Sequence, residues 1–387
     1  MVTGAYHPEI SSGGVQCRSM ARALAGRADI RVLTTAVDPR LERHALVDGV
    51  PVTRVVVDVT SRVSRLRAAR RMLVEVVKLA RRADVVHIHG CSTKNLLVTL
   101  VAKLVQRPVI LSLHTAGFDE PDAVKRHGRL AWWTFRAADR YLSVSPGLVD
   151  AYLASGLPPD RVRFVPNGID IDRFSPATAD ERAALRRRLG LPDAGAVILF
   201  VGFFSRDKQP RVLFDAWRSL HARGVTDATL VFVGATRSPY FEVDEGQADG
   251  MREEAVRLGL GERVVFAGTT HDPQDYYRAA DVFVLPSRRE GLPVALLEAM
   301  ASGLPCVASR LPGSTDVMIA DGENGLLVPV GDTDAFARAI AGLLRDRARA
   351  AMLGAAARTT ITCRFASADV ADLWLNAYDF RAAEGHG

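Results

Sequence analysis

Short apolar runs alternate along this chain with longer amphipathic stretches. The apolar runs, rich in Val, Ile and Leu, predict strands over residues 30–35, 50–57, 84–89, 108–114, 140–144, 162–165, 197–202, 229–233, 263–267, 281–285, 306–308 and 325–328. Several runs are apolar on consecutive positions, which is typical of strands buried on both faces of a parallel sheet. Amphipathic stretches such as 65–81, 211–223 and 334–344 predict helices between them. This alternation predicts a doubly wound α/β architecture.

The strand–helix alternation occurs twice, with one polar, turn-rich break between the two series. Residues 166–176 read PNGIDIDRFSP and have no periodic apolar pattern. We therefore expect two Rossmann-like domains, residues 1–172 and residues 173–365. Ligands of such sheets bind beyond the carboxyl ends of the strands, so the expected site is a cleft between two facing domains.

The first strand is unusually short. Only Met1, Val2 and Thr3 precede Gly4, whereas a core strand usually has about five residues. Two interpretations follow: the strand is truncated, or the natural start lies upstream of Met1.

The composition excludes several classes of protein. Of the 387 residues, 48% are hydrophobic and 24% are charged, which excludes a mostly disordered chain. The longest apolar run, around residues 194–204, is too short to span a bilayer, and no charged-then-apolar leader opens the chain. The spacing of the four cysteines fits neither a zinc site nor a disulfide framework. We therefore expect a cytoplasmic protein with reduced thiols.

The net charge of +6 is unevenly distributed. Residues 1–173 have a balance of +10 and the remainder a balance of −4, so the first half is expected to meet an anionic partner. Between Arg62 and Arg82 lie eight basic residues, one acid (Glu75) and an apolar stripe at helical spacing. A solvated helix packed on its sheet is the slightly favoured interpretation. The alternative is peripheral contact with an anionic membrane at its inner face. Nucleic acid is disfavoured because no aromatic residues are interleaved.

Two carboxylates eight residues apart form the strongest chemical signal. Segment 287–300 reads SRREGLPVALLEAM and follows the strand predicted over 281–285. If a helix starts near Pro293, Glu290 lies in the loop at its N-terminus and Glu298 lies one to two turns inside. Free N–H groups at a helix start favour an anion, and Gly291 permits close approach of a ligand. On spacing alone, an exposed loop followed by a surface helix is the favoured interpretation.

In its setting, this segment resembles the Glu-x7-Glu motif of the retaining glycosyltransferases of family 4, which have the GT-B fold. The resemblance extends over nearly the whole chain and its parts keep the family's order. The matching segments are 6–9 with 12–15, 84–90, 111–114, 165–170 with 173–174, and 322–328 with 331–332.

The resemblance implies an N-terminal acceptor-binding domain and a C-terminal domain that binds a nucleotide sugar. It also implies that the C-terminal segment, 366–387, returns to cover the first domain. Residues 365–380 have the amphipathic pattern that such a crossing helix needs. A plain surface helix is the alternative interpretation.

Roles of the donor site are implied by the same resemblance. Glu290 would bind hydroxyls of the donor sugar, and Glu298 would bind the ribose of the nucleotide. Backbone near the sugar and diphosphate would come from the stretch Gly291, Leu292, Pro293 and Val294. Gly14, in a Gly13-Gly14 loop before a helix from about Val15, would offer its N–H to the distal phosphate.

A phosphate clamp is expected after the strand predicted over 197–202. Lys208 matches the family's lysine, and cations there would stabilise a leaving diphosphate. The family's arginine usually follows the glycine directly, but that position is Phe203. Arg206 is the candidate replacement, with an exposed loop residue as the alternative. The chain also departs from the family at 312–316, PGSTD, where a later glutamate is usual.

Histidines supply the candidates in the first domain. The resemblance places His114 beside the reacting carbon of the donor sugar, whereas a core or capping histidine is the alternative. His89, with Gly13, is expected to touch the acceptor, and His87 to be structural. His87 and His89 lie two positions apart, but no third ligand has suitable spacing, so no metal is expected.

Together these expectations describe a retaining, metal-independent glycosyltransferase that needs no cofactor. A UDP-sugar is the favoured donor and a GDP-sugar the alternative, and the acceptor is a glycan, a glycolipid or a small molecule. Two other functions stay open: a GT-B epimerase or phosphorylase, and a nucleotide-sugar-binding protein that has lost catalysis. An oxidoreductase is disfavoured, because no Gly-x-Gly-x-x-Gly follows any predicted strand.

Overall fold

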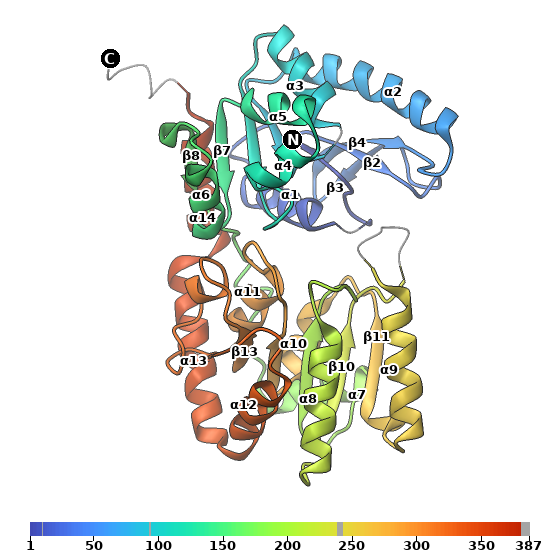
Figure 1. Ribbon diagram of the computed structural model, residues 1–387, viewed down its shortest axis with the longest axis vertical. Coiled ribbons are helices and arrows are strands. Elements are labelled where there is room, and N and C mark those ends of the chain that lie inside the picture. Colours follow the sequence, from blue (N-terminus) through green and yellow to red (C-terminus); the bar gives the residue numbers. More distant parts are fainter. Residues whose placement is uncertain (10, 93, 238–242, 381–387) are drawn as a thin grey trace. The chain divides into compact units, whose positions relative to one another are not determined.

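The computed structural model describes residues 1–9, 11–92, 94–237 and 243–380 (Figure 1). They form two α/β units. The first unit comprises Met1–Gly168 and the segment from Ser367, and the second comprises Ile169–Ala366. The division therefore lies four residues before the boundary expected after residue 172.

The first unit contains an eight-stranded sheet in the order β3-β4-β2-β1-β5-β6-β7-β8, parallel except for β3. Its strands are β1 Val2–Thr3, β2 Val32–Ala36, β3 His44–Val47, β4 Val50–Val56, β5 Val86–His89, β6 Val109–Leu113, β7 Arg140–Ser143 and β8 Val162–Phe164. Its helices are α1 Ser12–Ala23, α2 Arg62–Ala80, α3 Asn95–Leu104, α4 Pro121–Arg126, α5 Arg129–Arg136, α6 Pro146–Ala154, η1 Pro159–Arg161 (a 3₁₀ helix) and α14 Ser367–Tyr378.

The second unit contains a six-stranded parallel sheet in the order β11-β10-β9-β12-β13-β14. Its strands are β9 Val197–Val201, β10 Thr229–Val233, β11 Val264–Gly268, β12 Val282–Leu285, β13 Cys306–Ser309 and β14 Leu326–Val328. Its helices are α7 Ala179–Arg188, α8 Pro210–Ala222, α9 Glu245–Arg257, α10 Pro273–Ala279, α11 Val294–Ala301, α12 Thr333–Arg345 and α13 Arg347–Arg364, with 3₁₀ helices η2 Gly261–Arg263 and η3 Thr315–Val317.

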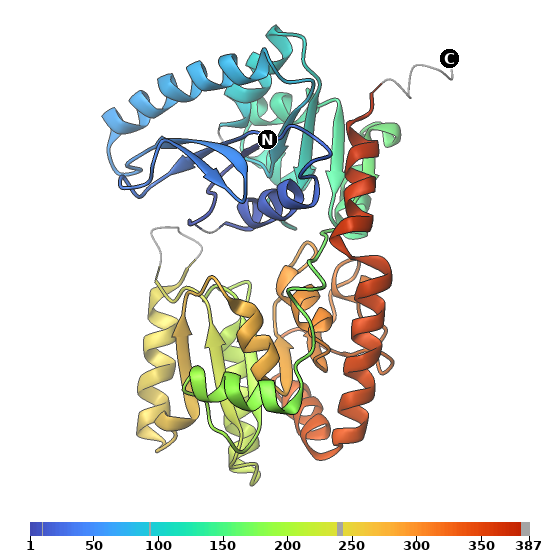
Figure 2. The same cartoon turned by 180° about the vertical axis from the view of Figure 1, so that it is seen from behind.

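The doubly wound α/β prediction is confirmed. Every strand expected from the apolar runs is present, with its ends displaced by at most two residues. In the second unit α8 packs beside α12 on one face of the sheet, and α7 packs on α10 on the other (Figure 2). The core between sheet and helices combines aliphatic side chains with large aromatic ones, of which Phe200, Phe232 and Trp217 are fully buried. Helices on both faces explain why the strands lack an alternating pattern.

In the N-terminal half, one strand was not predicted and another is as short as the sequence suggests. Strand β3 was not predicted, because it is an edge strand with two exposed residues and only Val47 buried, so it has no apolar run. Strand β1 has only two residues, yet it lies at the centre of its sheet. Val2 pairs with Leu33 on one side and with Ile88 on the other.

The C-terminal helix α14 belongs to the first unit, as the crossing-helix prediction requires. Its residues Val370 and Trp374 are buried in a core that includes Leu24 and Leu142. The Arg140 guanidinium also donates to the backbone oxygen of Ala377 at 2.6 Å. This segment therefore completes the hydrophobic core of a domain that the chain left some 200 residues earlier.

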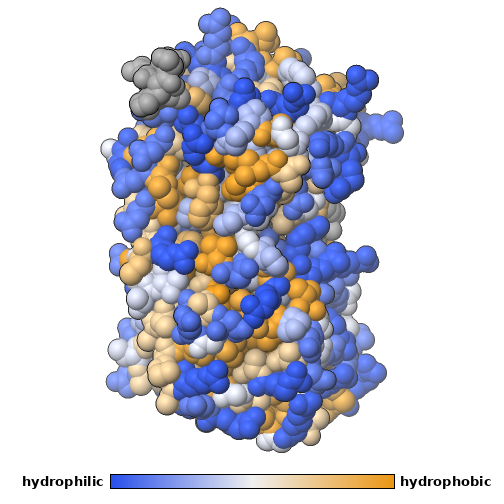
Figure 3. Space-filling model, turned by 60° about the vertical axis from the view of Figure 1, so that its left-hand side comes forward, coloured by the Kyte–Doolittle hydropathy of each residue, from blue (hydrophilic) through white to orange (hydrophobic). Residues whose placement is uncertain are grey.

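Among the described residues, none of the helices combines the length and the apolar character needed to cross a membrane. On the face shown in Figure 3, hydrophilic side chains predominate and apolar ones form patches between them.

Candidate functional site

The order of strands in the second unit brings together two loops that carry expected site residues. Strand β9 lies between β10 and β12, so the chain leaves β9 in one direction and returns on its other side at β12. The loops that follow β9 and β12 begin at the same edge of the sheet, at the topological switch point. These are residues 202–209 and 286–293, which hold most of the expected donor site.

Lys208 and Glu290 meet at this switch point. The Lys208 Nζ atom lies 2.6 Å from Oε1 of Glu290 and 2.8 Å from Oε2. The Glu290 side chain is 8% exposed and that of Lys208 is 27% exposed. A buried carboxylate requires such a partner, and both oxygens are satisfied by one ammonium. The structure therefore brings together two residues that lie 82 positions apart in the chain.

A second set of charges beside this pair was missed at the sequence level. Asp207 accepts from Nε of Arg288 at 2.8 Å and also pairs with the Arg289 guanidinium. The backbone N–H of Arg288 donates to the Asp207 carbonyl at 2.8 Å. Partial burial raises the pKa of Asp207, but its bonds to the two arginines outweigh burial and lower it. Their positions in the sequence could have revealed them, because Asp207 directly precedes Lys208, and Arg288 and Arg289 directly precede Glu290.

Arg206 does not join this cluster. Its side chain is exposed, and no hydrogen bond or ion pair connects it to another described residue. Arg288 and Arg289 instead pair with Asp207, the residue that precedes Lys208 in the chain.

Helix α11 follows the second of these loops, residues 286–293, and carries Glu298. Pro293 is its N-cap and offers no capping side chain, so the first N–H groups of the helix have no side-chain partner in the described part of the chain. Glu298 is the fifth helical residue, and its Oε2 accepts from the Tyr277 hydroxyl at 2.8 Å. Burial raises the pKa of Glu298 to about 7, although Tyr277 and Arg173 oppose this. Gly291 and Leu292 are buried in the turn before the helix.

The Gly13-Gly14 prediction needs a correction. Helix α1 begins at Ser12, so both glycines lie in its first turn and not in a loop before Val15. The Gly14 N–H is bonded to Oγ of the N-cap Ser11 at 3.0 Å. A Cβ at Gly14 would lie 2.0 Å from the carbonyl oxygen of Ala5. Close packing of backbone on backbone is thus what requires glycine here.

Three histidines of the first unit, His87, His89 and His114, form one cluster in which His87 and His89 are buried. Nδ1 of His89 lies 3.2 Å from Nε2 of His114, and the rings stack. His87 is held between the hydroxyls of Ser112, at 2.7 Å, and Tyr378, at 2.8 Å. Burial lowers the pKa of all three imidazoles, so they are neutral at pH 7. Gly13 lies over His89, because a Cβ there would be 3.5 Å from the His89 carbonyl oxygen.

Asp119 positions the loops around this cluster and was missed by sequence reasoning. Its carboxylate is buried and accepts three backbone N–H groups: Cys91 at 2.7 Å, His114 at 2.8 Å and Thr115 at 2.9 Å. These bonds tie the ends of β5 and β6 together. Its bonds to His114 and Thr115 are local, whereas its bond to Cys91 depends on the adjacency of β5 and β6, which the sequence neighbourhood does not reveal.

Lys94 is the other missed charge. Its ammonium donates to the carbonyl of Thr3 and the hydroxyl of Thr35, both at 3.1 Å. Burial lowers its pKa to about 8.

Among the described residues, no group of three His, Cys, Asp or Glu side chains is placed so that it could hold a metal ion.

Comparisons with known proteins agree with this architecture. Residues 13–168 match the family model "Glycosyl transferase 4-like domain", and residues 181–360 match "Glycosyl transferases group 1". D-inositol 3-phosphate glycosyltransferase 1 of Catenulispora acidiphila is 31% identical over 344 residues, which cover 85% of this chain and 81% of that protein. The D-inositol 3-phosphate glycosyltransferase of Salinispora tropica is 37% identical over 219 residues, 54% of this chain and 44% of that protein.

Solved structures share the fold. Anabaena HepE in complex with UDP-glucose has a TM-score of 0.78 at 19% identity and covers 97% of this chain and 98% of that one. Sucrose-phosphate synthase from Thermosynechococcus elongatus has a TM-score of 0.77 at 22% identity, over 99% of each chain. With both units matched by family models and a relative matched over most of its length, the chain belongs to the glycosyl transferases group 1 family and is a glycosyltransferase of the GT-B fold.

Proposed function

We propose that the protein is a retaining glycosyltransferase that moves a sugar from a nucleotide diphosphate sugar to an acceptor hydroxyl. The observation that supports this best is the convergence at the switch point of the second unit. There the Lys208–Glu290 pair lies on adjacent loops, and α11 holds Glu298 behind an N-terminus with no capping side chain. A cation, a helix start and two carboxylates are suited to a phosphorylated, polyhydroxylated ligand.

In this proposal the bond from the anomeric carbon to the diphosphate oxygen breaks, and the acceptor oxygen bonds to that carbon from the same face. The acceptor proton passes to an oxygen of the leaving diphosphate. Lys208 and the N–H groups of α11 stabilise the charge that develops on that diphosphate. Glu290 binds sugar hydroxyls and acts as neither nucleophile nor base. Protein cations serve where a metal ion would otherwise neutralise the phosphates, and no cofactor takes part.

UDP is the first nucleotide to test and GDP the second, because HepE, which shares the fold, has been solved with UDP-glucose. For the acceptor we propose a hydroxyl of a polyol phosphate or a related anionic glycan or glycolipid. Its support is the basic balance of residues 1–173 and the names of the relatives, which act on D-inositol 3-phosphate. His89 and Gly13 would contact that acceptor, and His114 the donor sugar.

The experiment is sugar transfer by the purified protein with labelled UDP- and GDP-sugars and a panel of polyol phosphates. Anomeric configuration in the product, read by NMR, tests retention. Lys208→Ala is expected to reduce transfer by about 100-fold or more. Lys125→Ala, which removes an exposed lysine of α4, is the matched control. Release of free sugar and nucleotide without an acceptor, or undiminished transfer by Lys208→Ala, would contradict the proposal.

We also propose that α2 contacts an anionic membrane. Its outer surface combines exposed arginines with apolar side chains that are unusually open to solvent, Leu66 at 75% and Val63 at 58%. Its acid, Glu75, is buried and paired with Arg43, so it does not offset the basic face. Sedimentation with vesicles of anionic phospholipid is expected to deplete the protein from solution, and replacing Arg70 and Arg71 by Glu to abolish this. Equal sedimentation with and without vesicles would refute membrane contact.

A further inference from the structure

Tyr277 is the only described side chain bonded to the Glu298 carboxylate. It lies on α10, is fully buried, and donates its hydroxyl proton to Oε2 at 2.8 Å. Its ring is fixed by two aromatic neighbours, with centroids 5.9 Å away for Phe174 and 5.7 Å for Phe283. The donor therefore has little freedom to move away from Glu298.

This bond divides the carboxylate into two unequal oxygens. Oε2 is engaged by the phenol, while no described residue bonds to Oε1. A carboxylate has about four lone-pair sites and accepts from several donors at once. Oε1 is thus the oxygen left to accept from a ligand, and the phenol fixes the direction in which it points.

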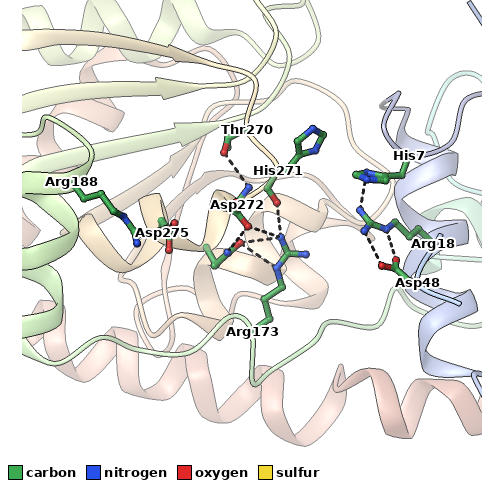
Figure 4. Close-up of polar contacts among 10 residues, drawn as sticks. His7, Arg18, Asp48, Arg173, Arg188, Thr270, His271, Asp272 and Asp275 are labelled. Atoms are coloured by element: carbon green, nitrogen blue, oxygen red, sulfur yellow. Dashed lines mark hydrogen bonds and ion pairs between the residues drawn. The ribbon is translucent and has the colours of Figure 1, made fainter. Parts of the chain in front are cut away.

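Arg173 is the charged group that acts on Glu298. Figure 4 shows its guanidinium turned to the 270–275 segment, where it donates to the His271 carbonyl at 2.7 Å and to Gln274 at 3.2 Å. Its charge favours the ionised form of Glu298, as does the phenol, whereas burial disfavours that form more strongly. The Cys306 thiol faces Tyr277 from β13, and its own pKa is raised by burial.

We propose that Tyr277 is a positioning residue, which orients Glu298 so that Oε1 accepts hydroxyl protons from the ribose of the nucleotide. This rests on the proposed function, in which Glu298 binds that ribose. Tyr277 does not touch the nucleotide itself. Its contribution is a fixed rotamer of Glu298 and a carboxylate that is more easily ionised.

A purely structural tyrosine would behave differently. Loss of its packing would lower the melting temperature and leave the pH dependence of nucleotide binding unchanged. A positioning role couples the phenol to the ionisation of Glu298, because the hydrogen bond favours the charged form. Removing the hydroxyl alone therefore separates the two roles.

The test is calorimetric titration of UDP, or GDP where the donor screen selects it, from about pH 5 to 9. In the unaltered protein, affinity is expected to rise with pH around a midpoint of about 7, as Glu298 ionises. Tyr277→Phe is expected to weaken binding about 10-fold at pH 7 and to move the midpoint to higher pH. Tyr276→Phe makes the same change one position earlier, where the hydroxyl has no described partner, and should leave both unchanged.

Two further measurements make the outcome decisive. With the 2′-deoxynucleotide, Tyr277→Phe should weaken binding much less, because the 2′-hydroxyl that Glu298 would accept from is absent. Replacement of Tyr277 by 3-fluorotyrosine, a more acidic phenol of nearly equal volume, should move the midpoint to lower pH even if Tyr277→Phe fails to fold.

The failure of this inference differs from the failure of the proposed function. If Glu298→Gln binds the nucleotide as tightly as the unaltered protein does, the ribose role of Glu298 is wrong. If Glu298→Gln weakens binding and removes the pH dependence, while neither change at Tyr277 moves the midpoint, the positioning role alone is overturned.

Discussion

The strand ends of the two units handle charge in different ways. In the second unit, charged side chains are paired with charged side chains: Lys208 with Glu290, and Asp207 with Arg288 and Arg289. At the strand ends of the first unit, the Asp119 carboxylate is held by backbone N–H groups, and the Lys94 ammonium by carbonyl and hydroxyl oxygens. The histidines beside them are neutral.

This difference bears on which ligand each surface can receive. Side-chain cations can turn to an incoming phosphate, because Lys208, Arg288 and Arg289 have long side chains that are partly exposed. Backbone donors are fixed in the loops that carry them, so the charges of the first unit hold loop positions. At these strand ends the second unit thus holds its charges through other charged side chains, and the first holds them through backbone and hydroxyl groups.

The largest effect is expected from removing Asp119. Asp119→Ala would leave three backbone N–H groups without their acceptor, which costs about 3–5 kcal/mol of unfolding free energy. Asp122→Ala, an exposed position on α4, is the control and should change stability by less than about 0.5 kcal/mol. Urea denaturation measures both. Equal midpoints for the two variants would show that Asp119 does not hold the loops.

A pH dependence of opposite sign in the two units is the second prediction. The pKa of Glu298 is raised from 4.5 to about 7. Its contribution to the free energy of unfolding is therefore fully present below pH 4.5 and is lost as the pH rises through about 7. This shift corresponds to at most about 3 kcal/mol. The buried histidines have lowered pKa values, so their contribution is full above their ordinary value of 6.5 and is lost as pH falls.

Tryptophan resonances can resolve the two responses within the intact chain. After labelling with 5-fluorotryptophan, Trp217 reports on the second unit, and Trp132, Trp133 and Trp374 report on the first. Between about pH 5 and 7, the first unit should gain stability and the second should lose it. Glu298→Gln should remove the loss. If both units respond in the same direction, the comparison fails.

The smallest effect is expected from Asp207. Its partners are partly exposed, so Asp207→Asn should cost only about 1 kcal/mol of stability. Transfer activity should fall by about 10-fold, because the two loops of the switch point lose a connection. Asp215→Asn, also paired with arginines but on the outer face of α8, is the control for activity. An unchanged turnover number in Asp207→Asn would show that the ion pairs of Asp207 with Arg288 and Arg289 do not contribute to transfer.

The sequence predicted more of the second unit's site than of the first's. Lys208, Glu290 and Glu298 were singled out through the family resemblance, because they lie in contiguous motifs that match the family's order. Lys94 was not, because its partners Thr3 and Thr35 lie far away in the chain, and Asp119 was not, because its bond to Cys91 depends on the adjacency of β5 and β6. Arg206 illustrates the converse: proximity in sequence to Lys208 did not bring its side chain into the cluster.

The sequence by itself determined the strands and the repeated α/β alternation, since each depends on local pattern. Only the tertiary structure decided which charges meet. The β9–β12 adjacency makes Lys208 a partner of Glu290, the start of α1 at Ser12 places Gly14 against Ala5, and the packing of α10 gives Glu298 its phenol. These contacts depend on strand order and helix packing, and one-dimensional periodicity carries no information about the order in which parallel strands lie side by side.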